Sequence, residues 1–258
     1  MESSNRVPRA AVAVVLAALA AVLAGACGGG SPATPSPPAT TGPTVALTTT
    51  HFRILTDGAD ASVLRAVADA LEANYPRVTD ELRSGDLPVV DVWVWQNEAA
   101  YYADMQRYLG TVYQGSAGWV RGARGISVLV VSNTPLHAVH EFVHVVSLAV
   151  NPTFANNPRW LWETVALYEN GQFVDPARLE YLQAGRFPTL ADLTADYSTG
   201  RQVYEVGYVL GEFIVATWGM NGLLELIRAN GALERVFQLT TGQFEQRFYA
   251  WLRARYLS

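Results

Sequence analysis

The stretch Val139–Val145 reads VHEFVHV and places an H-E-x-x-H motif inside an apolar run. His140 and His144 are four residues apart, so on an α-helix they share one face and lie about 6 Å apart along the axis. Two imidazoles in this arrangement can bind one metal ion, and Glu141 lies beside them, where its carboxylate can take a proton from water. The motif therefore predicts a Zn²⁺ site with His140 and His144 as ligands.

A second helix is predicted at Pro158–Glu169, PRWLWETVALYE, because a proline opens it and its apolar residues recur at helical spacing. Glu163 falls in this apolar setting, where a carboxylate is costly unless it is paired or bound to a metal. Residues 145–162 separate His144 from Glu163, which is enough chain for a loop that folds the second helix back. We therefore expect Glu163 to be the third ligand, as in catalytic His₂Glu zinc sites.

The three ligand positions, their spacing and the pattern W-L-x-E-x-x-A-x-Y that ends at Tyr168 resemble the gluzincin metallopeptidases. The chain is similar to the aminopeptidase-N-like branch of that superfamily, and most of all to small bacterial domains called peptidase-MA-like. The resemblance covers residues 137–219. It implies a zincin-like fold, a catalytic zinc held by His140, His144 and Glu163, and Glu141 as the general base of peptide-bond hydrolysis.

The stretch Val203–Tyr208, VYEVGY, resembles the start of a helix that carries a tyrosine in the same branch. In the family that tyrosine donates a hydrogen bond to the oxyanion, so the resemblance implies this role for Tyr204. The alternative for Tyr204 is an aromatic residue that packs at a helix start. Tyr197 is a second candidate for the donor.

Two departures from the family pattern shape the expected activity. The G-x-M-E-N segment that anchors the free amine of aminopeptidase substrates has no match here, so an endopeptidase is expected rather than an aminopeptidase. Leu167 stands where thermolysin-like members have a carboxylate, which leaves the groups that orient the histidines unassigned. Residues 125–131 are expected to form the edge strand along which a peptide substrate pairs.

Three further polar residues have alternative interpretations. His137 lies one turn before His140, and we interpret it as a polar residue at a helix start rather than as part of the site. Glu169 is interpreted as an exposed carboxylate at a helix end, the alternative being a hydrogen bond to a ligand histidine. His51 is interpreted as a solvated residue of a strand.

The N-terminus is typical of an export signal. Arg6 and Arg9 precede an apolar run of small residues that ends at Ala26, which predicts a signal peptide at residues 1–26. The sequence LAGAC that ends at Cys27 resembles a bacterial lipobox, which implies cleavage before Cys27 and attachment of lipid to it. The alternatives are an ordinary signal peptide and an uncleaved anchor. Either way the folded domain is expected outside the cytoplasm.

Residues 27–49 are rich in Gly, Pro, Ser and Thr and carry no charge, so they predict a flexible tether behind the lipidated cysteine. The folded domain is then expected at residues 50–258. With 50% hydrophobic residues, this length is enough for one sizeable core. The net charge of −5 gives no reason to expect a nucleic-acid partner, and the single cysteine excludes both an intramolecular disulfide and a Cys-based zinc site. We expect a monomer.

The order of the predicted elements indicates an α+β fold. A front half contains a small mixed sheet of three or four strands with helices, and the remainder is mainly helical, with the metal-binding helix at the junction. The expected function is a membrane-tethered, extracytoplasmic zinc metallopeptidase that acts on peptides or proteins through a zinc-activated water. The alternatives are a catalytically silent zinc-containing domain that binds a peptide or envelope component, and a structural zinc domain.

Overall fold

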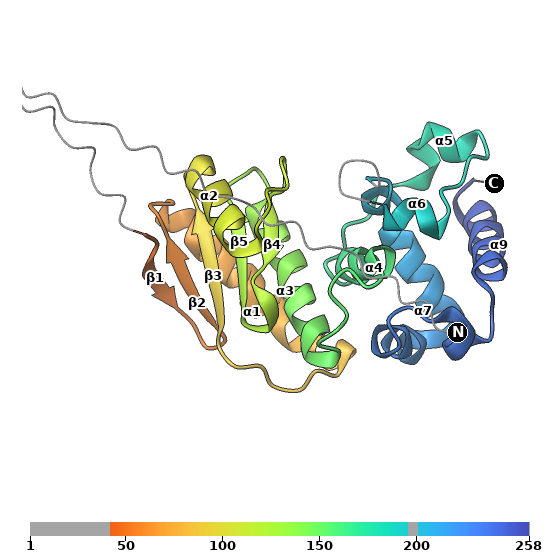
Figure 1. The fold of residues 1–258 in the computed structure, drawn as a ribbon, viewed down its shortest axis with the longest axis horizontal. Coiled ribbons are helices and arrows are strands. Elements are labelled where there is room, and N and C mark those ends of the chain that lie inside the picture. Colours follow the sequence, from red (N-terminus) through yellow and green to blue (C-terminus); the bar gives the residue numbers. More distant parts are fainter. Residues whose placement is uncertain (1–41, 196–200, 258) are drawn as a thin grey trace, which may run out of the picture. The chain divides into compact units, whose positions relative to one another are not determined.

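The computed structural model describes residues 42–195 and 201–257 (Figure 1). These residues belong to one compact unit, Thr41–Ser258. The predicted signal peptide, Cys27 and the candidate Tyr197 lie outside the described residues, so the lipid anchor stays a prediction.

A five-stranded mixed sheet forms the N-terminal part of this unit, in the order β1-β2-β3-β5-β4. The pairs β2–β3 and β3–β5 are parallel, and the outer pairs β1–β2 and β4–β5 are antiparallel. The strands are β1 (Thr44–Thr48), β2 (Phe52–Thr56), β3 (Val90–Trp95), β4 (Gly118–Val120) and β5 (Gly125–Leu129).

The remaining elements are helices that connect or follow these strands (Figure 1). The α-helices are α1 (Ala61–Leu82), α2 (Glu98–Leu109), α3 (Thr134–Val150), α4 (Arg159–Glu169), α5 (Glu180–Gln183), α6 (Leu190–Thr194), α7 (Val203–Arg228), α8 (Leu233–Phe237) and α9 (Thr241–Leu252). Short helical turns are η1 (Gly122–Arg124), η2 (Pro176–Arg178) and η3 (Arg253–Leu257).

The two faces of the sheet have different covers because side chains alternate along each strand. In β3, Val90, Val92 and Val94 belong to the main core, which also contains the buried faces of α1 and α3. Trp95 of β3 points to the other face, where it joins a smaller cluster with residues of α2 and β4. Aromatic side chains pack against one another in the main core: Phe142 of α3 contacts Phe52 of β2, with the ring centroids 5.2 Å apart.

The structure corrects three predictions about the sheet and its start. Strand β1 lies in the segment that was predicted to be a tether, so the folded domain begins before residue 50, and the sheet has five strands rather than three or four. Strand β5 is not an edge strand, because it pairs with β3 on one side and β4 on the other. Among the described residues the edges are β1 and β4.

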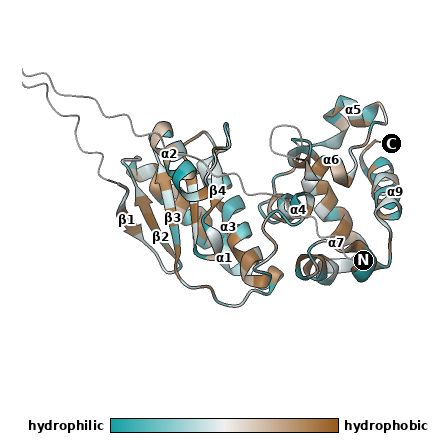
Figure 2. Cartoon of the chain, viewed as in Figure 1, coloured by the Kyte–Doolittle hydropathy of each residue, from teal (hydrophilic) through white to brown (hydrophobic). Residues whose placement is uncertain are grey.

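The part of the chain after β5 is helical, and its centre is the contact between α4 and α7. Two glycines allow this close approach: a Cβ at Gly207 would lie 2.5 Å from Cδ1 of Leu167, and one at Gly211 would lie 2.6 Å from Cβ of Tyr168. Helix α7 is largely hydrophobic (Figure 2). Among the described helices it alone is long and apolar enough to cross a membrane, but 50% of its apolar window is buried inside the fold, as in a core helix.

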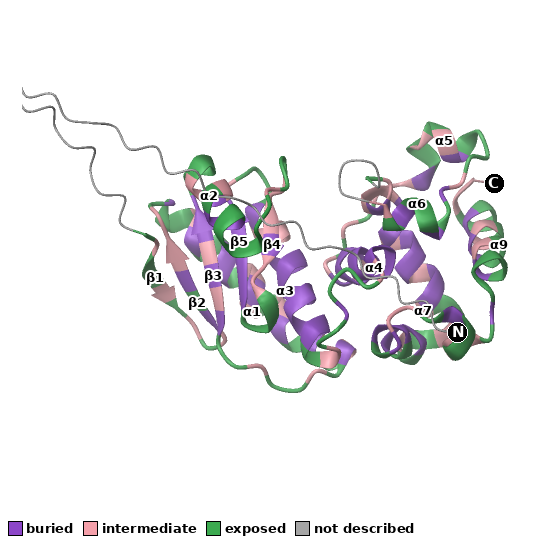
Figure 3. Ribbon diagram, in the orientation of Figure 1, coloured by how far each residue is buried: buried purple, intermediate pink, exposed green. Residues whose placement is uncertain are grey.

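The predicted α+β architecture is therefore confirmed: all the described strands lie in the first part of the chain, together with α1 and α2, and the part after β5 is helical. Helix α3, which carries the H-E-x-x-H motif, directly follows the last strand and precedes the helical part. Its position at this junction was predicted. Figure 3 shows that α3 is buried over most of its length.

Candidate metal centre

Helix α3 holds the two motif histidines on one buried face. It begins after Asn133, has Pro135 in its first turn, and consists mostly of apolar residues, which explains why most of the helix is buried in the core. The rings of His140 and His144 are 4.8 Å apart between centroids and nearly perpendicular. Both side chains are buried, and both Nε2 atoms face the same carboxylate.

That carboxylate belongs to Glu163 of α4, and its side chain is buried. Glu163 Oε2 lies 3.3 Å from Nε2 of His140 and 3.9 Å from Nε2 of His144. One ligand atom of each residue lies within 4.8 Å of the other two, so the three can share one metal ion. Ligands at about 2.0–2.1 Å from a tetrahedral ion lie roughly 3.4 Å apart, so small movements of the side chains suffice to close the site.

Burial and neighbouring charges shift the pKa values of the two histidines in opposite directions. Burial holds the pKa of His144 well below its usual range, and the neighbouring His140 lowers it further. His144 is therefore neutral, as a metal ligand must be. Burial also acts to lower the pKa of His140, but its hydrogen bond with Glu163 and the charges of Glu141 and Glu163 prevail and raise it. The donor set of two imidazoles and one carboxylate fits Zn²⁺.

Glu141 is buried beside this group, and strand β4 packs against it. A Cβ built on Gly118 would lie only 2.7 Å from Oε1 of Glu141, so the backbone of β4 passes directly over the carboxylate. Burial raises the pKa of Glu141 to about 8, His140 opposes the rise and Glu163 adds to it. A cation bound by the ligand group would favour the charged carboxylate and lower this pKa.

Two residues that sequence reasoning missed support the histidines. Asn170, at the C-terminal end of α4, places its Nδ2 atom 3.5 Å from Nδ1 of His140, while its Oδ1 accepts a hydrogen bond from the backbone N–H of Gln172. The indole of Trp162 stacks on the ring of His144 at 4.0 Å and 2°. Helical spacing from Glu163 would have placed both residues near the ligands, but not on the histidine rings.

The prediction that Glu169 is an exposed helix-end carboxylate is wrong. Its side chain is buried, and its Oε2 accepts a hydrogen bond from Nη1 of Arg77 at 2.8 Å. Thus Glu169 joins α4 to α1. The described structure gives it no hydrogen bond to His140 or His144. His51 is also more than a solvated residue, because its ring stacks on Tyr75 at 3.6 Å and its Nδ1 lies 2.7 Å from Glu72.

Tyr204 lies in the first turn of α7 and lines the same cleft as the metal group. The guanidinium of Arg159 lies 5.5 Å from the centroid of its ring. His137, one turn before His140, lines this cleft as well, and burial lowers its pKa. It is therefore part of the cleft wall, contrary to the interpretation that placed it outside the site.

The cleft has a volume of about 390 Å³ and has two walls. One consists of residues from α3, α4 and the start of α7, and the other is the segment 113–120, which ends in β4. The second wall was not recognised in the sequence, where this stretch shows only glycines and isolated aromatic residues. The lining residues of that wall are Tyr113, Gln114, Gly115, Ser116, Ala117, Gly118, Trp119 and Val120.

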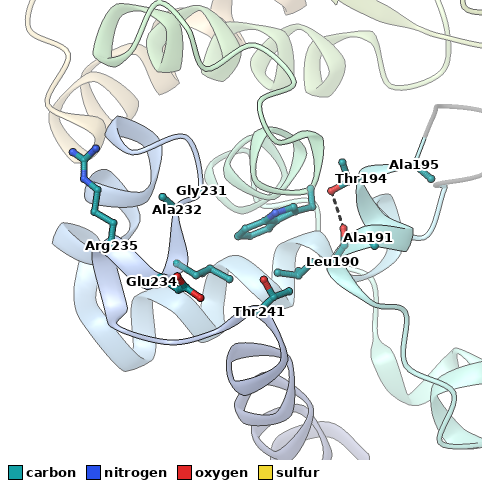
Figure 4. A pocket seen from close by; sticks show the side chains of 11 residues that line it. Leu190, Ala191, Thr194, Ala195, Gly231, Ala232, Glu234, Arg235 and Thr241 are labelled. Carbon is teal, nitrogen blue, oxygen red and sulfur yellow. Dashed lines mark hydrogen bonds between the residues drawn. The ribbon is translucent and has the colours of Figure 1, made fainter.

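A larger hollow of about 980 Å³ lies elsewhere in the helical part (Figure 4). Glu234 and Arg235 of α8 and Thr241 of α9 border it, and the hydroxyl of Thr194 donates a hydrogen bond to the carbonyl of Leu190 at 2.7 Å. None of its described lining residues is a histidine, and none belongs to the His140–His144–Glu163 group. We therefore place the candidate chemistry in the smaller cleft, where the ligand atoms converge.

No family model matches the chain, and no curated protein matches it in sequence.

Proposed function

We propose that the protein is a zinc-dependent peptide hydrolase of gluzincin type. The observation that carries the proposal is the buried group of His140, His144 and Glu163 at the wall of a cleft, with Glu141 beside it. Structural zinc sites are usually closed by four protein ligands, often cysteines. The group found among the described residues offers three ligands and borders a cleft, as a catalytic site requires.

When bound, the zinc would supply a Lewis acid that polarises the substrate carbonyl and makes a water acidic. The remaining work falls to side chains of this chain. Glu141 takes a proton from the attacking water and gives it to the leaving amine. Its burial against β4 keeps bulk water away from this proton, and the close approach of Gly118 fixes where the carboxylate can lie.

Two other features support peptide hydrolysis. The Tyr204 hydroxyl is the candidate donor to the oxyanion, because Tyr204 and the metal group line one cleft. Strand β4 pairs with β5 on one side only within the described sheet, so its other edge can accept an extended peptide. Since Gly118 of β4 lies against Glu141, a peptide on this edge would pass beside the general base.

The proposal is tested with the full chain, a mixed library of quenched fluorescent peptides, and Glu141→Gln. Glu225→Gln is the matched control, since Glu225 is exposed on α7 and pairs only with Arg228 in the described structure. We expect the wild type to cleave peptides and a chelator to abolish this cleavage. The cleavage rate should fall on the order of 10³-fold in Glu141→Gln and stay unchanged in Glu225→Gln. Metal content is measured in parallel for each variant.

The outcomes separate the alternatives. A wild-type rate in Glu141→Gln would remove Glu141 from the chemistry. Bound zinc without cleavage of any peptide would favour the catalytically silent binding domain. A chain that binds no metal would overturn the proposal.

We also propose that a lipid on Cys27 holds this domain at a membrane outside the cytoplasm. The support is the apolar run that ends in LAGAC, followed by an uncharged segment rich in Gly, Pro and Ser. Metabolic labelling with a fatty acid should mark the wild-type chain and not Cys27→Ser. Equal labelling of both chains would refute the anchor.

A further inference from the structure

The proposed function gives a role to some of the charged side chains that line the cleft and not to others. The carboxylates among its described lining residues are Glu141 and Glu163, and the proposed function uses them as general base and metal ligand. The described lining residues therefore offer no further carboxylate that could bind an amine of the substrate. Among the described residues that line the cleft there is also one arginine, Arg201, and this cation is not used by the metal group or by the proton transfers.

Arg201 has a defined place relative to the proposed chemistry. Its carbonyl accepts a hydrogen bond from the backbone N–H of Tyr204 at 3.0 Å, so it precedes this candidate donor by one helical turn. Its side chain is exposed, whereas the other groups of this wall, His140, His144 and Glu163, are buried. A guanidinium at this point can meet a substrate that enters from solvent.

Other arginines near the cleft are already engaged. Arg121 lies between the rings of Trp93 and Trp119 and pairs with the buried Asp104. Arg159 is buried and donates to the carbonyl of Ala195 at 2.7 Å. Within the part of the chain that the structure describes, Arg201 has no carboxylate at ion-pair distance. It can therefore bind an anion without losing an existing partner.

We infer that the cleft accepts peptides that carry a carboxylate on the Arg201 side of the scissile bond, and that Arg201 determines this specificity. The inference rests on the proposed function for the statement that the ligands are peptides. A guanidinium binds a carboxylate through two parallel hydrogen bonds, whereas a neutral amide cannot complete this pair. The carboxylate can be the C-terminus of the peptide or an Asp or Glu side chain.

The first experiment measures binding rather than turnover. Zinc-loaded full chain carrying Glu141→Gln is titrated in a calorimeter with N-acetylated peptides of one sequence: the free acid, the C-terminal amide, and amides with a single Asp at each position in turn. We expect one of the carboxylate peptides to bind on the order of tenfold more tightly than the neutral amide. The peptide that gains affinity identifies the source of the carboxylate.

The second experiment assigns the effect to Arg201. In the same background, Arg201→Gln should remove the preference, Arg201→Lys should keep part of it, and Arg178→Gln should keep all of it. Arg178 is the matched control because its side chain is exposed and it does not line the cleft. High salt should weaken the preference, because the charge pair is near solvent. Equal zinc content and melting temperature show that Arg201→Gln is folded.

The results distinguish this inference from the proposed function. Equal affinity for the neutral and carboxylate peptides, absence of binding by all of them, or a preference that survives Arg201→Gln would overturn the inference, even if the wild type cleaves peptides. A preference that depends on Arg201 in a chain that cleaves no peptide would support the inference about recognition and refute the proposed hydrolysis.

Discussion

The two walls of the cleft are held by different kinds of contact. On the wall formed by α3 and α4, the residues His140, His144 and Glu163 are 2–8% exposed, and their helices contribute many residues to the main core. On the opposite wall, Tyr113 is 39% exposed, and the residues before β4 are held by single hydrogen bonds, whereas β4 itself pairs with β5 and buries Trp119. Gly115 donates to the hydroxyl of Tyr102 at 2.9 Å, and the hydroxyl of Ser116 donates to the carbonyl of Gly118 at 2.6 Å.

The two walls suit two different roles in the proposed site, metal binding and contact with the substrate. Metal ligands must keep their geometry before a metal binds, and burial between two packed helices provides that rigidity. A wall that meets substrate needs exposed groups, and the exposed hydrogen bonds of the residues before β4 give this part of the wall lower local stability. Helix α2 therefore has a specific role, because its side chains hold the second wall in place.

The largest effect is expected from a substitution in the wall that contains His140, His144 and Glu163. Glu163→Ala removes one of the three proposed ligands, and loss of the cation should reduce the proposed hydrolysis on the order of 10³-fold or more, because a metal contributes several kcal/mol to such a reaction. Elemental analysis and peptide cleavage measure both effects. Glu225→Ala is the control. Full zinc content in Glu163→Ala would show that Glu163 is not a ligand.

The next largest effect is expected when the wall formed by residues 113–120 loses its attachment to α2. Asp104 is buried, and it pairs with Arg121, which packs against Trp119. Asp104→Ala leaves a buried guanidinium without its anion, so the free energy of unfolding should fall by about 3–5 kcal/mol. Chemical denaturation measures this loss. Arg228→Gln, which breaks an exposed ion pair, should leave stability nearly unchanged, and an equal loss in both variants would contradict the comparison.

A third substitution creates a steric clash between the two walls of the cleft. In Gly118→Ala the new methyl group would lie 2.7 Å from Oε1 of Glu141, so either β4 or the carboxylate must move. A displacement of this size near the chemistry should reduce kcat by about 100-fold while zinc stays bound. Gly242→Ala is the control, since a Cβ there meets no atom within 4 Å. An unchanged kcat would mean that the contact between Gly118 and Glu141 is not needed.

The smallest effect is expected from the group that supports His140. Asn170→Ala removes the amide next to Nδ1 of that ring and should weaken zinc affinity by about tenfold, because outer groups orient metal ligands. Competition with a chelating dye measures the affinity. Asn74→Ala is the control, since the Asn74 side chain bonds within α1 and toward Arg77. Equal affinities in the three chains would refute an orienting role for Asn170.

The sequence by itself determined the parts that depend on local periodicity. The spacing of His140 and His144 places them on one helical face whatever the tertiary structure is. Asn97 is a local signal of the same kind, because its side chain caps α2 by accepting from Ala100 N–H. Glu163 was identified because a carboxylate in an apolar helix must find a partner, although its direction in space depended on the loop before α4.

Only the tertiary structure decided the rest, because those features depend on contacts between residues far apart in the chain. The segment Thr44–Thr48 follows a stretch typical of a tether and becomes a strand by pairing with β2. Strand β5 lies inside the sheet because β4 turns back beside it. Likewise Glu169 is buried because Arg77, 92 positions away, provides its partner, and no local pattern can reveal a partner at that distance.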